Sequence, residues 1–246
     1  MNLSRARTAL LGVSLSLLAV VALLALLVVP ADRYQGDAQR LLYVHVGTAW
    51  TAYVCFALVA VGSIAYLVRR RMLWDRIAGA AASVGVGMAG LTLVLGSLWA
   101  KPTWGTFWTW DPRLVSTAAL LLIYLGYLGV RDLSEDATVN ARRSAVFGVL
   151  ALVIVPVVHF STVWWRTLHQ PPGVLRPGGP QETMPTEMVL LLLLATFSLT
   201  LLAVALVWER VARQTAVLDV ERGPVESVTR VSVGTPGARD DEGGTQ

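Results

Sequence analysis

Charged residues are scarce in this chain. Asp, Glu, Lys and Arg together make up 15% of its 246 residues, whereas 55% are hydrophobic, and the mean hydropathy is +0.60. A soluble globular domain carries about 25% charged residues. The composition therefore excludes the soluble globular class and indicates an integral membrane protein.

Cysteine is almost absent too, because Cys55 is the only one. A single thiol cannot build a disulfide framework, and the chain has no Cys-x-x-Cys-His motif for covalent haem attachment. We interpret Cys55, which lies in an apolar run, as a packing residue. The sequence also lacks a Walker motif, so it offers no ATP-hydrolysing site of its own.

Long apolar runs dominate what is present. A hydrocarbon core of about 30 Å requires roughly 20 apolar residues of helix, and the chain supplies that length six times. We predict an all-α, polytopic membrane domain over 1–213, followed by a polar, disordered cytoplasmic tail over 214–246. The predicted spans are Thr8–Val29, Val46–Val68, Ile77–Ala100, Leu114–Val130, Ser144–Trp165 and Met188–Trp208.

Basic residues at the ends of these spans predict the orientation. With the N-terminus inside, eleven of them flank the cytoplasmic ends and six flank the outer ends, as the positive-inside rule requires. Both termini are therefore predicted to be cytoplasmic, and the connections after spans one, three and five to face outward. Because the cations lie at membrane boundaries rather than in one patch, the net charge of +4 implies no nucleic-acid partner.

Tryptophans gather in the predicted outer connections, above all in the segment 99–113, WAKPTWGTFWTWDPR. A single indole at a membrane interface is typically an anchor. Six of nine together, with Gly105 allowing close backbone approach, favour a platform for a large flat ligand. The six are Trp99, Trp104, Trp108, Trp110, Trp164 and Trp165.

Two of the three histidines face the same predicted compartment. His45 begins the second span and His169 lies in the third outer connection. Neutral imidazole is a good ligand for haem iron, and two rings would fill both axial positions; the alternative for each is an interfacial hydrogen-bonding residue. His159 lies deeper, and we favour a structural histidine bonded to a neighbouring helix over an iron ligand.

Charged residues beside the tryptophans complete the predicted site. Lys101, Arg113 and Arg166 are placed to hold haem propionates, although each has the alternative of a cation that only extends to the interface. Asp111 precedes a proline, an arrangement typical of a helix N-cap followed by Pro at the first helical position. We therefore expect Asp111 to cap the fourth helix and so to position the tryptophan-rich loop.

These segments resemble the CcmC family, the haem-handling membrane proteins of bacterial cytochrome c maturation. WGTFWTWD is similar to the signature of the wider haem-handling superfamily, and LLYVHVGTAW and HFSTVWWRTLHQ resemble segments particular to CcmC. The resemblance covers residues 8–210. It departs at Gly47, where the family usually has proline, and we expect this glycine to loosen the turn beside His45.

The resemblance implies roles for individual residues. His45 and His169 would be the axial ligands of the haem iron. The tryptophan loop would shape the haem site and meet the haem chaperone CcmE, through Trp104, Gly105, Trp108, Trp110 and Asp111.

The resemblance also implies an assembly. Non-covalent haem b would be presented to CcmE by a complex with the ATP-binding cassette subunits CcmA and CcmB and the small subunit CcmD, in the bacterial plasma membrane and in contact with its lipid. The chain would be a haem-transfer protein rather than an enzyme.

Two alternatives stay open. One is a transporter that moves haem through its own bundle, although Pro156 is the one notable break in spans with few polar groups. The other is a haem-containing electron carrier, although the outer histidines have no inner counterparts.

Overall fold

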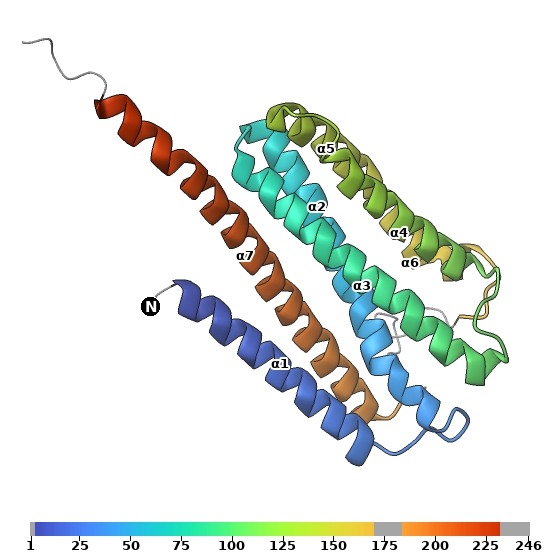
Figure 1. The fold of residues 1–246 in the computed structure, drawn as a ribbon. Coiled ribbons are helices and arrows are strands. Elements are labelled where there is room, and N and C mark those ends of the chain that lie inside the picture. The colour runs from blue at the N-terminus through green and yellow to red at the C-terminus, as the bar shows by residue number, and fades with distance from the viewer. Residues whose placement is uncertain (1–2, 170–183, 232–246) are drawn as a thin grey trace, which may run out of the picture.

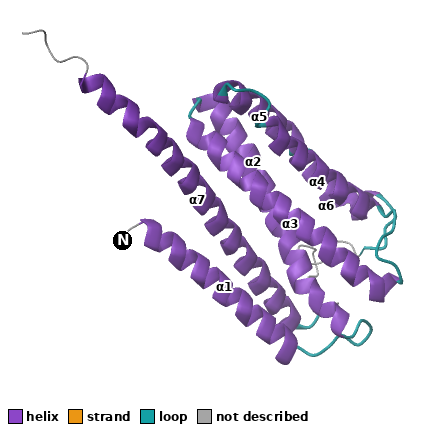
Figure 2. Cartoon of the chain, in the orientation of Figure 1, coloured by secondary structure: helices purple, strands orange, loops and turns teal. Residues whose placement is uncertain are grey.

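The chain folds into an elongated helical bundle. A computed structural model describes residues 3–169 and 184–231, with side chains as far as 217. In those ranges every regular element is a helix, as predicted, and Figure 2 shows no strand there. Six helical segments are long and apolar enough to cross a membrane, which confirms the predicted number of spans. The elements are α1 Leu3–Leu27, the 3-10 helix η1 Asp37–Arg40, α2 Leu41–Arg69, α3 Met72–Trp104, α4 Pro112–Val130, α5 Ala137–Ala151, α6 Ile154–Trp164 and α7 Thr186–Val231.

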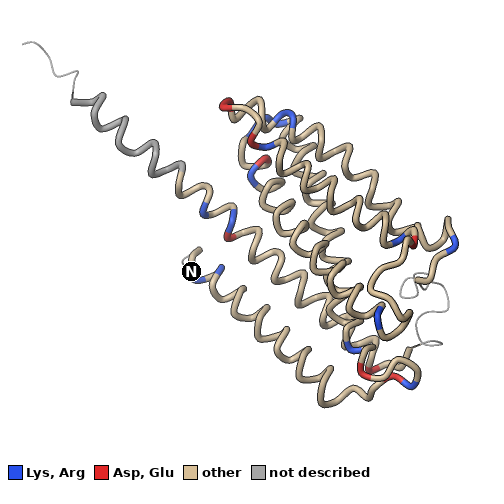
Figure 3. The backbone as a smooth tube through the Cα atoms, turned by 45° about the vertical axis from the view of Figure 1, so that its right-hand side comes forward, with Lys and Arg blue, Asp and Glu red and all other residues tan. Residues whose placement is uncertain are grey.

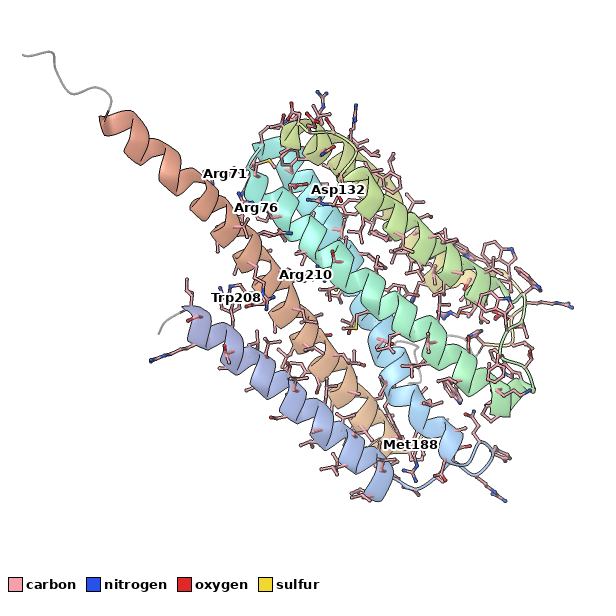
Figure 4. All side chains as sticks on the ribbon, in the orientation of Figure 1. Arg71, Arg76, Asp132, Met188, Trp208 and Arg210 are labelled. Atoms are coloured by element: carbon pink, nitrogen blue, oxygen red, sulfur yellow. The ribbon has the colours of Figure 1, made fainter. Side chains whose placement is uncertain are left out.

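The helices form three groups in Figure 1: α1 beside α7, α2 and α3 in the centre, and α4, α5 and α6 on the opposite flank. The α1–α2 and α3–α4 connections and the last turn of α6 lie at one end, here named the tryptophan end. The opposite end, where α2 meets α3 and α4 meets α5, is named the arginine end. Charged residues gather toward these two ends (Figure 3). Figure 4 shows Arg71, Arg76 and Arg210 toward the arginine end and Met188 toward the tryptophan end.

The predicted fifth span is divided in two. Helix α5 ends at Ala151 and α6 begins at Ile154, with Leu152 and Val153 donating to carbonyls only three residues back. Pro156 lacks a backbone N–H, and its ring clashes with the carbonyl of residue 152 in a regular helix, so the break lies one turn before the proline. The segment also begins at Ala137, earlier than the predicted Ser144, because Asp136 caps it by accepting from the amides of Thr138 and Val139.

Two helices extend beyond the predicted boundaries. Helix α3 continues past Ala100 to Trp104 and ends where Gly105 adopts a φ of 79°, a left-handed C-terminal stop that favours glycine. Helix α7 continues through the first part of the expected tail to Val231, and Glu209 and Arg213 pair one turn apart on it at 2.7 Å. Residues 232–246 of that predicted tail lie outside the described residues.

Small residues and aromatic rings build the core between the central helices. Ala78, Ala80, Ala81 and Ala82 of α3 are all buried, which allows α2 and α3 to approach closely. Phe56 of α2 stacks on Tyr124 of α4 with ring centroids 3.6 Å apart. Cys55 is buried in the same cluster, as its predicted packing role requires.

A buried ion pair joins α3 to α4 at the arginine end. Both terminal nitrogens of Arg131 donate to Asp75, at 2.8 Å and 2.6 Å, and one of them also donates to the Tyr127 hydroxyl at 3.1 Å. Gly79 makes room for this arginine, because a Cβ there would lie 2.7 Å from the guanidinium carbon. Arg131 is therefore packed between α3 and α4 at the arginine end, with 19% of its side chain exposed.

Candidate functional site

His45 lies inside α2 and is held by α3. Its Nδ1 is 3.0 Å from the backbone oxygen of Thr92, and its ring meets the edge of Trp99 at a centroid distance of 5.7 Å. A carbonyl oxygen only accepts hydrogen bonds, so Nδ1 carries the proton in the neutral ring. Nε2 then keeps its lone pair, which is the atom that binds a metal.

The expectation that Gly47 loosens a turn beside His45 is wrong. Residue 47 is an interior position of α2, not part of a turn, and a Cβ there would lie 2.6 Å from Leu199 Cδ1 of α7. Glycine therefore serves close helix packing at this position. The rigidity of His45 comes from the helices on which it packs.

Asp111 ties the α3–α4 connection to the segment after α6. One carboxylate oxygen accepts from the Arg113 amide at 2.9 Å, which confirms the predicted N-cap of α4 with Pro112 at the first position. The other oxygen accepts from Thr167 Oγ1 at 2.6 Å and from the Leu168 amide at 2.7 Å. This carboxylate is buried, so it is a tether between two connections as well as a cap.

His169 is the fourth partner of that carboxylate. Its Nδ1 lies 3.1 Å from Asp111 Oδ1, and its ring contacts Trp104 edge-on at 5.0 Å. Although burial favours the neutral acid, the hydrogen bonds from Thr167, Leu168 and Arg113 outweigh it and lower the pKa of Asp111 below 3.8. Asp111 is therefore an anion that accepts the Nδ1 proton, which leaves Nε2 of His169 free.

The imidazole of His169 is uncharged at neutral pH. Burial lowers its pKa below 6.5, and the charge of Arg113 lowers it further, whereas Asp111 opposes the shift. His45 and His169 thus share one property: each neutral ring donates from Nδ1 and offers Nε2. His45 lies in the second turn of α2 and His169 follows α6, so both rings lie at the tryptophan end.

The tryptophans do not form one flat surface. Trp108 and Trp110 meet at 89°, and Trp164 and Trp165 meet at 80°. Trp110 is 85% exposed, whereas Trp99 donates from Nε1 to Gln35 at 2.9 Å. The indoles therefore present several separate edges and faces rather than a single stack, and Trp99 and Trp104 are the ones that contact His45 and His169.

The three predicted propionate partners differ in their surroundings. Lys101 donates to the Gly105 carbonyl at 3.0 Å and lies 5.3 Å from the centre of the Phe107 ring. Arg113 donates to the His159 carbonyl at 3.5 Å. Arg166 is exposed. Arg113 is the only one of the three placed between α4 and α6, beside the histidines.

His159 packs against aromatic rings. Its imidazole meets Trp50, Tyr53 and Phe160 edge-on, at 5.7, 6.2 and 4.9 Å. The expected hydrogen bond from its ring to a neighbouring helix is not present among residues 3–169 and 184–217. His159 instead packs at the interface of α2 and α6 in an aromatic box formed by Trp50, Tyr53 and Phe160.

This arrangement suits a metal that brings its own equatorial ligands. Within the described residues no group of three or more His, Cys, Asp or Glu side chains could hold a bare metal ion. A porphyrin supplies four nitrogens itself and needs only axial ligands, which two neutral imidazoles provide. The surrounding indoles suit the apolar ring, and the exposed cations suit its carboxylates.

Sequence reasoning missed the residues that hold the two histidines. Thr92, which fixes His45, is one threonine among many apolar helix residues, and Thr167 contacts Asp111 across a separation of 56 residues. No local pattern marks either position. The Asp-Pro pair that revealed the cap was the only available signal.

The tether leads to a prediction about loop order. Asp111→Asn should lower the protection of the Leu168 amide in hydrogen–deuterium exchange by at least about tenfold, because the new amide nitrogen cannot accept from Thr167 and Leu168, and such charged hydrogen bonds contribute about 1.5–3 kcal/mol each. Asp136→Asn is the matched control, since Asp136 caps α5 through local bonds alone. Unchanged exchange in Asp111→Asn would refute the tether.

Acid should weaken the protection of the Leu168 amide in the same way, but only at a pH below 3.8, where Asp111 becomes protonated. Folding lowers the pKa of Asp111, so the unfolded chain binds more protons, and the stabilisation is fully present above 3.8 and lost as the pH falls through the lower folded value. The same amide should therefore stay protected in wild type at pH 5.

Comparisons with known proteins place this chain among relatives of similar description. The family model described as "Heme exporter protein C" (CcmC) matches residues 1–225. The chain is similar to the heme exporter protein C of Bradyrhizobium diazoefficiens, with 37% identity over 177 residues, 72% of this chain and 66% of that protein. It is also similar to the heme exporter protein C of Haemophilus influenzae, with 34% identity over 75% of each chain. A third relative, a putative cytochrome c biosynthesis ccmC-like mitochondrial protein of Marchantia polymorpha, is 37% identical over 69% of this chain and 72% of its own length.

Proposed function

Because the chain belongs to the CcmC family of heme exporter proteins, we propose that it binds haem b non-covalently at the tryptophan end and presents it to a partner protein. As a family member it is a multi-pass membrane protein of haem handling in cytochrome c biogenesis. In the proposed orientation the tryptophan end faces outward in the bacterial plasma membrane and both termini face the cytoplasm, as the basic residues favour.

One observation carries the proposal. His45 and His169 lie at the same end, and each uses Nδ1 to reach an acceptor, Thr92 and Asp111 respectively. Both Nε2 atoms are then ready to bind iron without a change of tautomer. Haem iron accepts two such axial ligands.

The surroundings support binding of the rest of the haem. Trp104 contacts His169 and Trp99 contacts His45, so each proposed ligand has an indole at its side. Arg113, beside these rings, is the proposed partner of a propionate, with Lys101 and Arg166 at the exposed rim. Gly105 permits the backbone to come close to the porphyrin.

Exposed indoles support transfer to a partner. Trp110, Trp164 and Trp165 are 85%, 56% and 50% exposed, and large exposed aromatic groups are typical of protein contacts. We propose that this surface, with Trp108, receives the haem chaperone CcmE. The ATP-binding cassette subunits CcmA and CcmB and the small subunit CcmD are the further proposed partners, since this chain has no Walker motif.

A haem titration tests the proposal. Purified protein in detergent should take up reduced haem saturably at one site and show a low-spin spectrum, because two imidazoles create a strong ligand field. Adding the soluble domain of CcmE should then remove haem from the protein. An uptake that does not saturate, or a purely high-spin spectrum, would contradict the proposal.

Vesicles distinguish presentation from transport. Haem flux into vesicles that contain this chain alone should equal the flux into empty vesicles. A higher flux would favour the alternative of a pathway through the bundle.

A further inference from the structure

We propose that Gly96 is a positioning residue for His45. The absence of a side chain at this position of α3 lets the imidazole reach the Thr92 carbonyl and so directs Nε2 toward the iron. The inference rests on the proposed haem function, which it deepens by naming a residue that fixes the orientation of the His45 imidazole.

A side chain at position 96 would require the imidazole of His45 to move. A Cβ built on Gly96 would lie 2.8 Å from Cε1 of His45, 3.3 Å from Nδ1 and 3.8 Å from Nε2. Ordinary carbon contacts begin at about 3.5 Å. A methyl group at position 96 would therefore push the ring by about several tenths of an ångström, mainly at Cε1 and next at Nδ1.

Two contacts of the ring would change if it moved. The Nδ1–Thr92 bond of 3.0 Å fixes one edge, and Trp99 meets the ring at 5.7 Å and 72°. Moving the ring away from Gly96 lengthens the hydrogen bond or turns χ1 and χ2 from their present values. Either change weakens the hydrogen bond that keeps the proton on Nδ1, and it alters the direction in which Nε2 points.

The backbone beneath the ring cannot follow the movement. The hydroxyl of Thr92 in α3 donates to the hydroxyl of Thr48 in α2 at 2.9 Å, and Thr48 in turn donates to the carbonyl of His45 at 2.9 Å. These bonds join α2 to α3 one turn below the ring. Because the two helices are fixed there, displacement falls on the imidazole rather than on the helix spacing.

Glycine at 96 is not explained by helix formation, since glycine is a poor helix former. Two other glycines of α3 show what an unconstrained position looks like: a Cβ on Gly87 or on Gly90 would meet no atom within 4 Å. Gly90→Ala is therefore a matched control in the same helix. Both substitutions improve helix propensity, so neither should weaken α3 itself.

The test compares Gly96→Ala with Gly90→Ala in the full chain. Gly96→Ala should bind reduced haem about 10- to 100-fold more weakly, the usual effect of losing a group that orients a metal ligand, and should change the spectrum from low-spin toward high-spin. Gly90→Ala should match wild type. Added imidazole should restore the low-spin spectrum of Gly96→Ala, which a general folding defect would not allow.

A second measurement uses the haem-free protein. Nitrogen-15 spectra of histidine should show the Nδ1–H tautomer for His45 in wild type and in Gly90→Ala, and a mixture of tautomers in Gly96→Ala. Wild-type tautomer, spectrum and affinity in Gly96→Ala would overturn the inference. A wild type that takes up no haem would instead contradict the proposed function, and the nitrogen-15 spectra would still decide whether Gly96 fixes His45.

Discussion

Replacing His45 and His169 together by alanine should abolish the low-spin haem spectrum and weaken haem retention by more than about a hundredfold. Losing a group that merely orients a metal ligand costs about 10- to 100-fold in affinity, so losing both ligands costs more. Spectra of the purified variant, titrated with reduced haem, measure the effect. Each histidine uses Nδ1 to reach an acceptor and so offers Nε2.

The single variants should separate the two ligands. Either His45→Ala or His169→Ala leaves one axial imidazole, so each should give a five-coordinate, high-spin haem that added imidazole converts to low-spin. His159→Ala is the control, because its ring packs in an aromatic box of Trp50, Tyr53 and Phe160. Low-spin spectra in both single variants would remove the ligand assignment, and a loss in His159→Ala alone would move it to that residue.

Arg131→Ala should cause the largest loss of stability of any single substitution discussed here, about 3–5 kcal/mol. It removes a bidentate partner and leaves the Asp75 carboxylate, which is 7% exposed, unpaired in the bundle interior. The measurement is thermal unfolding of the purified protein in detergent. The double variant Asp75→Ala with Arg131→Ala should recover part of the loss, because no unpaired charge remains.

A second ion pair provides the control for Arg131→Ala. Arg213 pairs with Glu209 on α7, and 77% of its side chain is exposed. Arg213→Ala should leave the unfolding temperature nearly unchanged, since solvent screens exposed pairs. Equal effects of Arg131→Ala and Arg213→Ala would show that the Asp75 pair is no more than a surface contact.

The six spans and the helix cap at Asp111 could be predicted because their signals are local. A membrane span needs a continuous apolar run, and Asp-Pro is a two-residue cap signal. The residues at which the helices end were harder to predict from the sequence. Pro156 ends the regular hydrogen bonding one turn before itself, and Gly105 stops α3 four residues beyond the predicted Ala100.

The contacts that position the proposed ligands could not be predicted. Thr92 meets His45 across 47 residues, and Asp75 meets Arg131 across 56. Such pairs depend on the register of two packed helices, which one sequence does not encode locally. The same packing sets how the indoles meet, with Trp108 and Trp110 at 89° and Trp164 and Trp165 at 80°.

The two histidines differ in how firmly they are mounted. His45 lies in α2 and packs on α3, helices of 29 and 33 residues. His169 instead contacts the carboxylate of Asp111, which caps α4, and the indole of Trp104. A partner pressing on the α3–α4 connection would strain His169 through that carboxylate and leave His45 where it is. The position of His45 is thus set by the helices, whereas the position of His169 depends on the α3–α4 connection.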